Sequence, residues 1–182
     1  GRYQPLFADQ VALLEVRADD DMRGVEGFDG VADVVSESKL REELRGDQDH
    51  RVDQRAFLRA RLVDMLIADW DRHEDQWRWA AYEPGELDPT LSGDAATEGK
   101  VYRPVAKDHD FAFYGINGVA PYFIRRFGDE RLQGFSDDFG KIRGLTANGF
   151  EQDRRFFNEL TREDMQSVVA EVQQMLSDAV VD

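Results

Sequence analysis

The sequence contains no cysteine, which excludes disulfide bonds and thiolate metal sites. It also lacks an uninterrupted apolar run of the roughly 18 residues that a membrane helix needs, so we expect no membrane span in this segment. Lysine is scarce, because only four of the 23 basic residues are lysines, at positions 39, 100, 107 and 141. Without a basic patch to displace counterions, the chain is not expected to bind nucleic acid.

Acidic residues are abundant instead. Asp and Glu total 38, and the net charge is −15. Few lysines and a strongly negative surface suit a halophile-like protein that works in high salt, where screening weakens the repulsion between like charges. Ordinary acidic proteins share this composition, and both interpretations remain open at this point.

The length and the two ends of the chain bear on its domain organisation. The 182 residues are enough for one domain with its own core. The chain begins with Gly rather than Met, and residues 178–182 contain no helix-ending Gly or Pro. We therefore expect residues 1–182 to form a single domain, a fragment of a longer protein whose other domains are its partners.

The strongest helical pattern runs from about residue 52 to residue 69. Its apolar residues occupy most sides of the predicted helix, which is typical of a central, buried helix. One face consists of Leu58, Leu62, Met65 and Leu66, and it is widened by Phe57, Ala60, Val63 and Ile67.

Two further helices are predicted from their caps. Ser36 or Ser38 can cap a short helix that carries Leu40 and closes at Gly46. Near the end of the chain, Thr161 begins a helix whose stripe of Met and Val is predicted to be core. That stripe comprises Met165, Val168, Val169, Val172, Met175 and Leu176.

Two strand-like segments enclose a polar loop. Residues 77–82 alternate as a strand does, and residues 101–106 form a second strand, in which Pro104 indicates an edge or a strand end. Between them, residues 83–100 are rich in Pro, Gly, Ser, Thr and acids, which predicts a long exposed loop. We expect a hairpin with an inserted loop. Residues 10–16 are a further candidate strand.

Two acidic clusters follow these elements. Asp71 follows the central helix and has an amide, Gln76, five residues later, while Asp110 follows the second strand. Phosphoryl transfer from a nucleotide needs a carboxylate near the acceptor hydroxyl and oxygen ligands for magnesium. Protein kinases place an Asp and an Asn on one loop and a second Asp on the next loop. The pattern therefore favours a kinase-like site.

The string Asp71-Arg72-His73, followed by Gln76, resembles the catalytic loop of phosphoinositide kinases, HipA-type toxin kinases and the secretory-pathway kinases that phosphorylate caseins. This resemblance implies that Asp71 is the catalytic residue, the base or the group that orients the acceptor hydroxyl, supported by Arg72 and His73. It also implies that Gln76 and Asp110 bind the metal and its nucleotide. The implied cofactors are Mg²⁺ or Mn²⁺ and ATP, and the implied partners are the nucleotide and an unknown phosphoryl acceptor.

Three longer strings extend the resemblance. Residues 68–79, 107–113 and 153–160 are similar to a largely uncharacterised bacterial family associated with large cell-envelope proteins. This likeness covers most of the chain and implies a location in the bacterial cell envelope. It supplies no activity.

The chain departs from the kinase pattern in three respects. Gln76 replaces the usual Asn, and the interval from Asp71 to Asp110 exceeds the roughly 20 residues of the kinase template. In addition, no Gly-rich loop precedes a strand that carries a lysine, since Lys39, the only upstream lysine, lies in a helical pattern. We therefore expect the nucleotide-covering lobe to lie outside this chain and the fragment alone to be inactive.

The predicted fold is α+β and mostly α: the C-terminal lobe of a protein-kinase-like fold with a small β-hairpin. The predicted function is ATP- and magnesium-dependent phosphoryl transfer by the full-length protein. Two alternatives remain open. One is a non-catalytic, pseudokinase-like binding module of a bacterial envelope protein, and the other is a metal-dependent hydrolase that uses the same acids without a nucleotide preference.

Several neighbouring residues have simpler interpretations. Arg72 is expected to pair with a buried acid, and His73 to fix the geometry of its loop by hydrogen bonding. Trp70, Trp77 and Trp79 are expected to pack in the core. Asp108 and His109 are weaker candidates for additional metal ligands.

Overall fold

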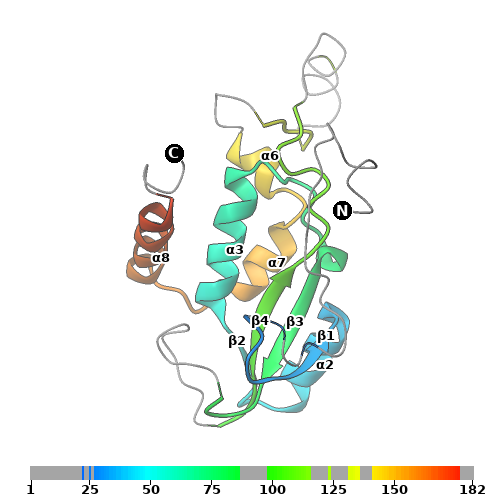
Figure 1. Ribbon diagram of the computed structural model, residues 1–182, viewed down its shortest axis with the longest axis vertical. Coiled ribbons are helices and arrows are strands. Elements are labelled where there is room, and N and C mark those ends of the chain that lie inside the picture. Colours follow the sequence, from blue (N-terminus) through cyan, green and yellow to red (C-terminus); the bar gives the residue numbers. More distant parts are fainter. Residues whose placement is uncertain are drawn as a thin grey trace, which may run out of the picture.

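The computed structural model describes residues 22, 25, 27–86, 98–115, 123, 131–135 and 141–176. The candidate strand at 10–16 and the middle of the loop between the two predicted strands lie outside these residues. The fold is α+β, as predicted (Figure 1).

The strands form one mixed sheet with the order β1-β3-β4-β2. Its members are β1 (Val31–Val35), β2 (Arg51–Val52), β3 (Trp77–Tyr82) and β4 (Val101–Ala106). Strands β3 and β4 pair antiparallel, so the predicted hairpin is confirmed. Strand β1 pairs antiparallel with β3, whereas β2 runs parallel to β4. The sequence pattern had not predicted β1 or β2.

The α-helices are α2 (Glu37–Gly46), α3 (Gln54–Leu66), α6 (Ile142–Thr146), α7 (Phe150–Phe156) and α8 (Arg162–Met175). A single 3₁₀ turn, η1 (Glu74–Gln76), precedes β3. Helix α3 lies between the sheet and α8, and its C-terminal end points toward α6 (Figure 1). Among the residues that the structure describes, no helix combines the length and the apolar character needed to cross a membrane.

The helix starts are set by polar caps. The Ser36 hydroxyl accepts a hydrogen bond from the backbone N–H of Lys39 and so caps α2. The carboxylate of Asp53 caps α3 in the same way. Thr161 and Asp164 form a reciprocal capping box at α8, which satisfies two N–H groups at this helix end. The predicted starts of α2 and α8 are confirmed.

The main core is aromatic. Trp77 and Trp79 lie two residues apart on β3 and therefore project from the same face of the sheet. Both are fully buried, as predicted, against Phe57 of α3 and Phe156 of α7. The ring of Phe57 lies 5.1 Å from that of Trp77 and 5.5 Å from that of Phe156. Leu40 of α2 completes this aromatic core.

Pro104 is accommodated because β4 loses its second neighbour before this residue. Strand β2 pairs only with Val101 and Tyr102, whereas Pro104 lies opposite Trp79 of β3. The side of β4 away from β3 therefore has no strand partner at Pro104 among the described residues, and the missing N–H leaves no ladder bond unmade. The prediction that Pro104 marks an edge is therefore correct for this part of β4, although β4 is flanked by β2 at its beginning.

The prediction that the central helix is buried on most of its apolar sides was right for Phe57 and Leu58 and wrong for Val63 and Leu66. Helix α3 buries Ala56, Phe57, Leu58, Arg61 and Asp64, whereas the side chains of Val63 and Leu66 are 40% and 45% exposed. Two charged residues thus occupy the buried face and two apolar residues lie on the surface. The apolar pattern alone predicts the opposite, because it takes no account of charges that find buried partners elsewhere in the chain.

The prediction that the apolar stripe of the last helix belongs to the core was also wrong. Only Val168 of its apolar stripe is buried in α8, and Met165, Val169, Met175 and Leu176 are exposed. Helix α8 is held to α3 partly by ion pairs, in which Glu171 contacts Arg55 at 2.7 Å and Arg59 at 2.9 Å. An apolar hollow lies between the two helices, lined by Leu62, Met65, Leu66, Ile142, Val169, Val172, Gln173 and Leu176.

Candidate functional site

The buried face of α3 changes from apolar to ionic along its length. Phe57, Arg61 and Asp64 are spaced by four and three residues, so they lie on one face. Phe57 enters the aromatic core, whereas Arg61 forms a bidentate pair with Asp153 of α7, at 2.7 and 3.1 Å. Arg61 also contacts Asp64 at 3.1 Å. The C-terminal half of α3 therefore anchors a buried ionic network.

Arg72 connects this network to the loop that follows α3. Its guanidinium lies 3.0 Å from Asp64 and 2.8 Å from Asp69, and both carboxylates are buried. The guanidinium carbon also lies 5.5 Å from the centre of the Trp77 ring. Arg72 thus pairs with buried acids, as predicted, and rests on the edge of the aromatic core.

Burial acts on the pKa values of this ionic network. Burial raises the pKa of Asp64, and the cations of Arg72 and Arg61 oppose that rise. Burial disfavours the charged form of Arg61, but the carboxylates of Asp153 and Asp64 outweigh it and raise the pKa of Arg61. The network is therefore sustained by mutual pairing, because each of these charges would be costly to bury alone.

The β3–β4 hairpin brings the two acidic loops together. The N–H of Lys107 donates to the carbonyl of Gln76 at 3.0 Å, and Arg72 donates to the carbonyl of Lys107 at 2.7 Å. Beyond the second loop, the N–H of Phe113 donates to the carbonyl of Ile67 at 2.9 Å. The loop after β4 therefore folds back onto the C-terminal end of α3.

Backbone strain is concentrated on these same loops. In the described part of the chain, the residues other than glycine with positive φ are Ala68 (57°), Asp108 (60°) and Phe113 (57°). Ala68 precedes Asp71 by three residues, and the other two flank Asp110 on either side. Left-handed conformations of such residues carry a penalty of about 1–3 kcal/mol each and cluster at functional sites. The strain marks both acidic loops as candidates for function.

Asp71 has a partner that the sequence analysis missed. Its side chain is partly exposed, and its Oδ1 accepts a hydrogen bond of 2.8 Å from Nδ2 of Asn148. Asn148 lies in the turn between α6 and α7, far from Asp71 in sequence. No local spacing rule connects these two residues, so only the tertiary structure could identify the pair.

Asp110 is exposed at the tip of the second loop and lies in a negative field. The pKa of Asp110 is raised, first by partial desolvation and then by the carboxylates of Asp108, Asp69 and Asp71. The structure thus brings the two sequence-predicted acids, Asp71 and Asp110, into one electrostatic environment. A group of neighbouring carboxylates binds a cation more favourably than one isolated carboxylate does.

Gln76 is buried, and its Oε1 accepts no hydrogen bond from the residues that the structure describes. Its Nε2 lies 3.5 Å from Nε2 of His73, and Nδ1 of His73 accepts from the N–H of Asp75 at 3.3 Å. His73 therefore fixes the local loop geometry, as predicted. An amide oxygen without a donor retains both lone pairs, which suits a ligand for a hard cation.

His109 belongs to the ionic network. It contacts Asp69 at 3.1 Å and is hydrogen-bonded to Arg72. The ligand atoms of Asp64, Asp69 and His109 lie within 4.8 Å of one another, a spacing that could suit a metal. However, Asp64 is already paired with the guanidinium groups of Arg61 and Arg72, and Asp69 is paired with Arg72, so this cluster is a poor cation site. The more exposed acids of the two loops remain for a cation, and Asp71 and Asp110 are among them.

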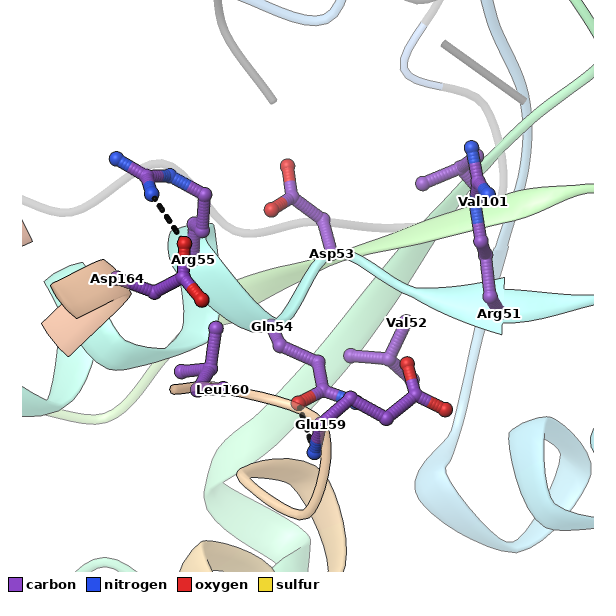
Figure 2. A pocket seen from close by; sticks show the side chains of 9 residues that line it. All are labelled: Arg51, Val52, Asp53, Gln54, Arg55, Val101, Glu159, Leu160 and Asp164. Atoms are coloured by element: carbon purple, nitrogen blue, oxygen red, sulfur yellow. Dashed lines mark hydrogen bonds and ion pairs between the residues drawn. The ribbon is translucent and has the colours of Figure 1, made fainter. Parts of the chain in front are cut away.

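A hollow of about 140 Å³ lies away from these acids, where β2 and the start of α3 meet the start of α8. Figure 2 shows that its polar side chains pair across the junction: Arg55 contacts Asp164, and Gln54 accepts from the N–H of Glu159. Asp53, which caps α3, lies 3.3 Å from Arg103. These contacts join the start of α3 to α8, to the segment that precedes α8 and to β4, and we assign this hollow a structural role.

Comparison with models of known protein families, with curated protein sequences and with solved structures finds no match to this chain.

Proposed function

We propose that this protein binds a divalent cation with ATP at the two acidic loops and takes part in phosphoryl transfer. The observation that carries the proposal is the meeting of these loops at the end of the hairpin. Asp71 and Asp110 come from separate loops, yet the charge of Asp71 acts on the carboxyl group of Asp110, and neither belongs to the ionic pairs of Arg72. Two partly exposed acids without a buried counter-cation suit Mg²⁺ or Mn²⁺.

Each residue has a distinct role in this proposal. Asp110 is the main ligand of the cation, and Gln76 offers its unpaired Oε1 as a second ligand. Asp71 orients the acceptor hydroxyl and accepts its proton. Arg72 and His73 hold the loop that carries Asp71. The cation, when bound, would neutralise negative charge on the phosphates of the nucleotide.

Binding of metal and nucleotide is the first test. The midpoint of thermal unfolding would be measured with Mn²⁺, with and without ATP, for the parent chain, Asp110→Asn and Asp75→Asn. Asp75 is an exposed acid of the neighbouring 3₁₀ turn, so its variant changes the net charge by the same amount. A ligand that binds only the folded state raises the midpoint. We expect a Mn²⁺-dependent ATP shift in the parent and in Asp75→Asn but not in Asp110→Asn.

Two results would contradict this proposal. One is the absence of any Mn²⁺-dependent ATP shift in the parent chain, in both high and low salt. The other is a metal-dependent turnover of a simple aryl phosphate with no preference for nucleotide, which would indicate a hydrolase that uses the same acids.

A non-catalytic binding module is a second candidate, favoured by the exposed apolar surface between α3 and α8. Leu66 is 45% exposed there, and Ile142 of α6 is 63% exposed. Exposed apolar surfaces of this kind commonly mark sites of protein interaction. Under this alternative the acidic loops contribute charge but bind no nucleotide, and the thermal-shift test distinguishes the two candidates.

A further inference from the structure

We propose that Asn148 is a positioning residue that holds one carboxylate oxygen of Asp71 and leaves the other oxygen to the acceptor. This inference rests on the proposed function for its meaning, but its geometry does not depend on that function. It adds a residue from the α6–α7 turn to a site otherwise built from the two acidic loops.

The hydrogen bonds around Asn148 determine which of its atoms faces Asp71. Nδ2 of Asn148 donates to Oδ1 of Asp71 at 2.8 Å, and Oδ1 of Asn148 accepts from Nη1 of Arg131 at 3.3 Å. A carboxylate can only accept and a guanidinium can only donate, so both contacts require the same amide orientation. The second oxygen of Asp71 lies 3.9 Å from Nε2 of His73, beyond hydrogen-bonding distance.

The turn that carries Asn148 is packed against the buried ionic network. Gly149 is buried, and a Cβ atom at this position would lie 2.5 Å from Nη2 of Arg61. Arg61 cannot easily move away, because it is held by Asp153 and by Asp64. The absence of a side chain at Gly149 therefore lets the turn approach Arg61 closely, and this approach fixes the position of Asn148.

The same network fixes the other end of the hydrogen bond. Asp64 binds Arg61 on one side and Arg72 on the other, and Asp71 is the residue immediately before Arg72. Asp71 is therefore next in sequence to Arg72, which binds Asp64, and Asn148 is next to Gly149, which lies against Arg61. Each partner of the hydrogen bond adjoins a residue held at the ionic network. A carboxylate held in this way has its orientation set before substrate binds, which is the requirement for a residue that orients a reacting hydroxyl.

The side-chain rotamer of Asp71 provides a test that does not require activity. Three-bond couplings to Cγ would be measured by NMR in the isotope-labelled parent, Asn148→Ala, Asn148→Ser and Asn158→Ala. Asn158 is an exposed asparagine that accepts from Gln54 and does not contact Asp71, so it is a matched control. We expect a single χ1 rotamer of Asp71 in the parent and in Asn158→Ala, and averaging over rotamers in Asn148→Ala.

The conservative variant and a neighbouring variant strengthen this test. In Asn148→Ser the shorter hydroxyl can donate to Asp71 only in part, so we expect intermediate couplings. Gly149→Ala leaves the amide in place but moves the turn away from Arg61, and it should also produce averaging. A single unchanged rotamer of Asp71 in folded Asn148→Ala and Gly149→Ala would overturn the proposal.

The hydrolysis of ATP with Mn²⁺ by the full-length protein, measured there because the fragment alone is expected to be inactive, separates this inference from the proposed function. Misplacement of a reacting group by about 1 Å can slow a reaction by about 10²-fold. We expect Asn148→Ala to slow hydrolysis by about 10- to 100-fold while Mn²⁺-dependent ATP binding stays at the parent level. If Asn148→Ala averages the χ1 rotamer of Asp71 but leaves the rate of ATP hydrolysis unchanged, the positioning role of Asn148 would be refuted. A full-length parent that neither binds nor hydrolyses ATP would refute the proposed function, and the rotamer result would still decide whether Asn148 orients Asp71.

Discussion

Two buried regions meet along α3 and are held by different forces. The aromatic core around Phe57, Trp77 and Trp79 is apolar and contacts the N-terminal half of the helix. The ionic network around Arg61, Asp64 and Arg72 occupies the next turns of the same face. Phe57, Arg72 and Asp64 are all at most 1% exposed, so burial alone does not distinguish the two regions.

The difference shows what each region contributes. Apolar packing stabilises in proportion to buried area and depends little on direction, so it holds the sheet and helices together. Buried ion pairs often stabilise no better than apolar residues of the same volume, because the charges lose their hydration. They do impose direction, since each guanidinium binds its carboxylates in a fixed geometry. We infer that the ionic network is kept for the placement of the Asp71 loop.

Removal of the central cation should have the largest effect. Arg72→Ala leaves Asp64 and Asp69 buried without their shared partner, and we expect a loss of about 3–5 kcal/mol in the free energy of unfolding. Urea denaturation of the parent and the variant measures this loss. Arg59→Ala is a suitable control, because the Arg59–Glu171 pair is partly exposed and such pairs contribute about 0–1 kcal/mol. Equal effects of the two substitutions would show that the ionic network adds no special stability.

A cavity in the aromatic core should destabilise the protein without disturbing the site. Leu40 is fully buried, and Leu40→Ala should lower the free energy of unfolding by about 2–5 kcal/mol. Its matched control, Leu66→Ala on the exposed side of α3, should change it by about 0.5 kcal/mol or less. We expect Leu40→Ala to keep the single Asp71 rotamer. Loss of that rotamer would mean that the two regions do not act separately.

The smallest effect concerns the pH dependence contributed by Asp110. Its pKa in the folded state is raised above the ordinary value of 3.8. The folded state therefore binds this proton more tightly than the unfolded chain does, and stability falls as the pH rises from that ordinary value through the raised one. Asp110→Asn should remove this fall and stabilise the apo protein at neutral pH by no more than about 1 kcal/mol, because the group is exposed.

Thermal unfolding of the parent and Asp110→Asn across this pH range measures which of the two is more stable. Saturating Mn²⁺ should reverse their order, so that the parent becomes more stable than Asp110→Asn at neutral pH. A parent more stable than the variant without metal would contradict the negative field assigned to Asp110.

The local pattern of the sequence predicted several elements of the fold, but not α6 or α7, whose connecting turn carries Asn148. The serine cap of α2, the hairpin of β3 and β4, and the capping box of α8 all follow from short-range rules, and the structure confirms them. The sequence also placed Asp71 at the end of a helix and Asp110 at the end of a strand. Their proximity then follows from the hairpin between them, because a hairpin returns the chain to its starting edge.

Local pattern could not predict how α3 packs or what holds Asp71. Hydrophobic periodicity favoured the face with Leu66, but tertiary structure buried Arg61 and Asp64 instead, because their partners Asp153 and Arg72 come from other elements. The contact of Asn148 with Asp71 likewise depends on a turn packed against Arg61. The sequence by itself therefore determined the local elements and the order of the acids. Only the tertiary structure decided which charges are buried together, since that energy arises from pairs far apart in the chain.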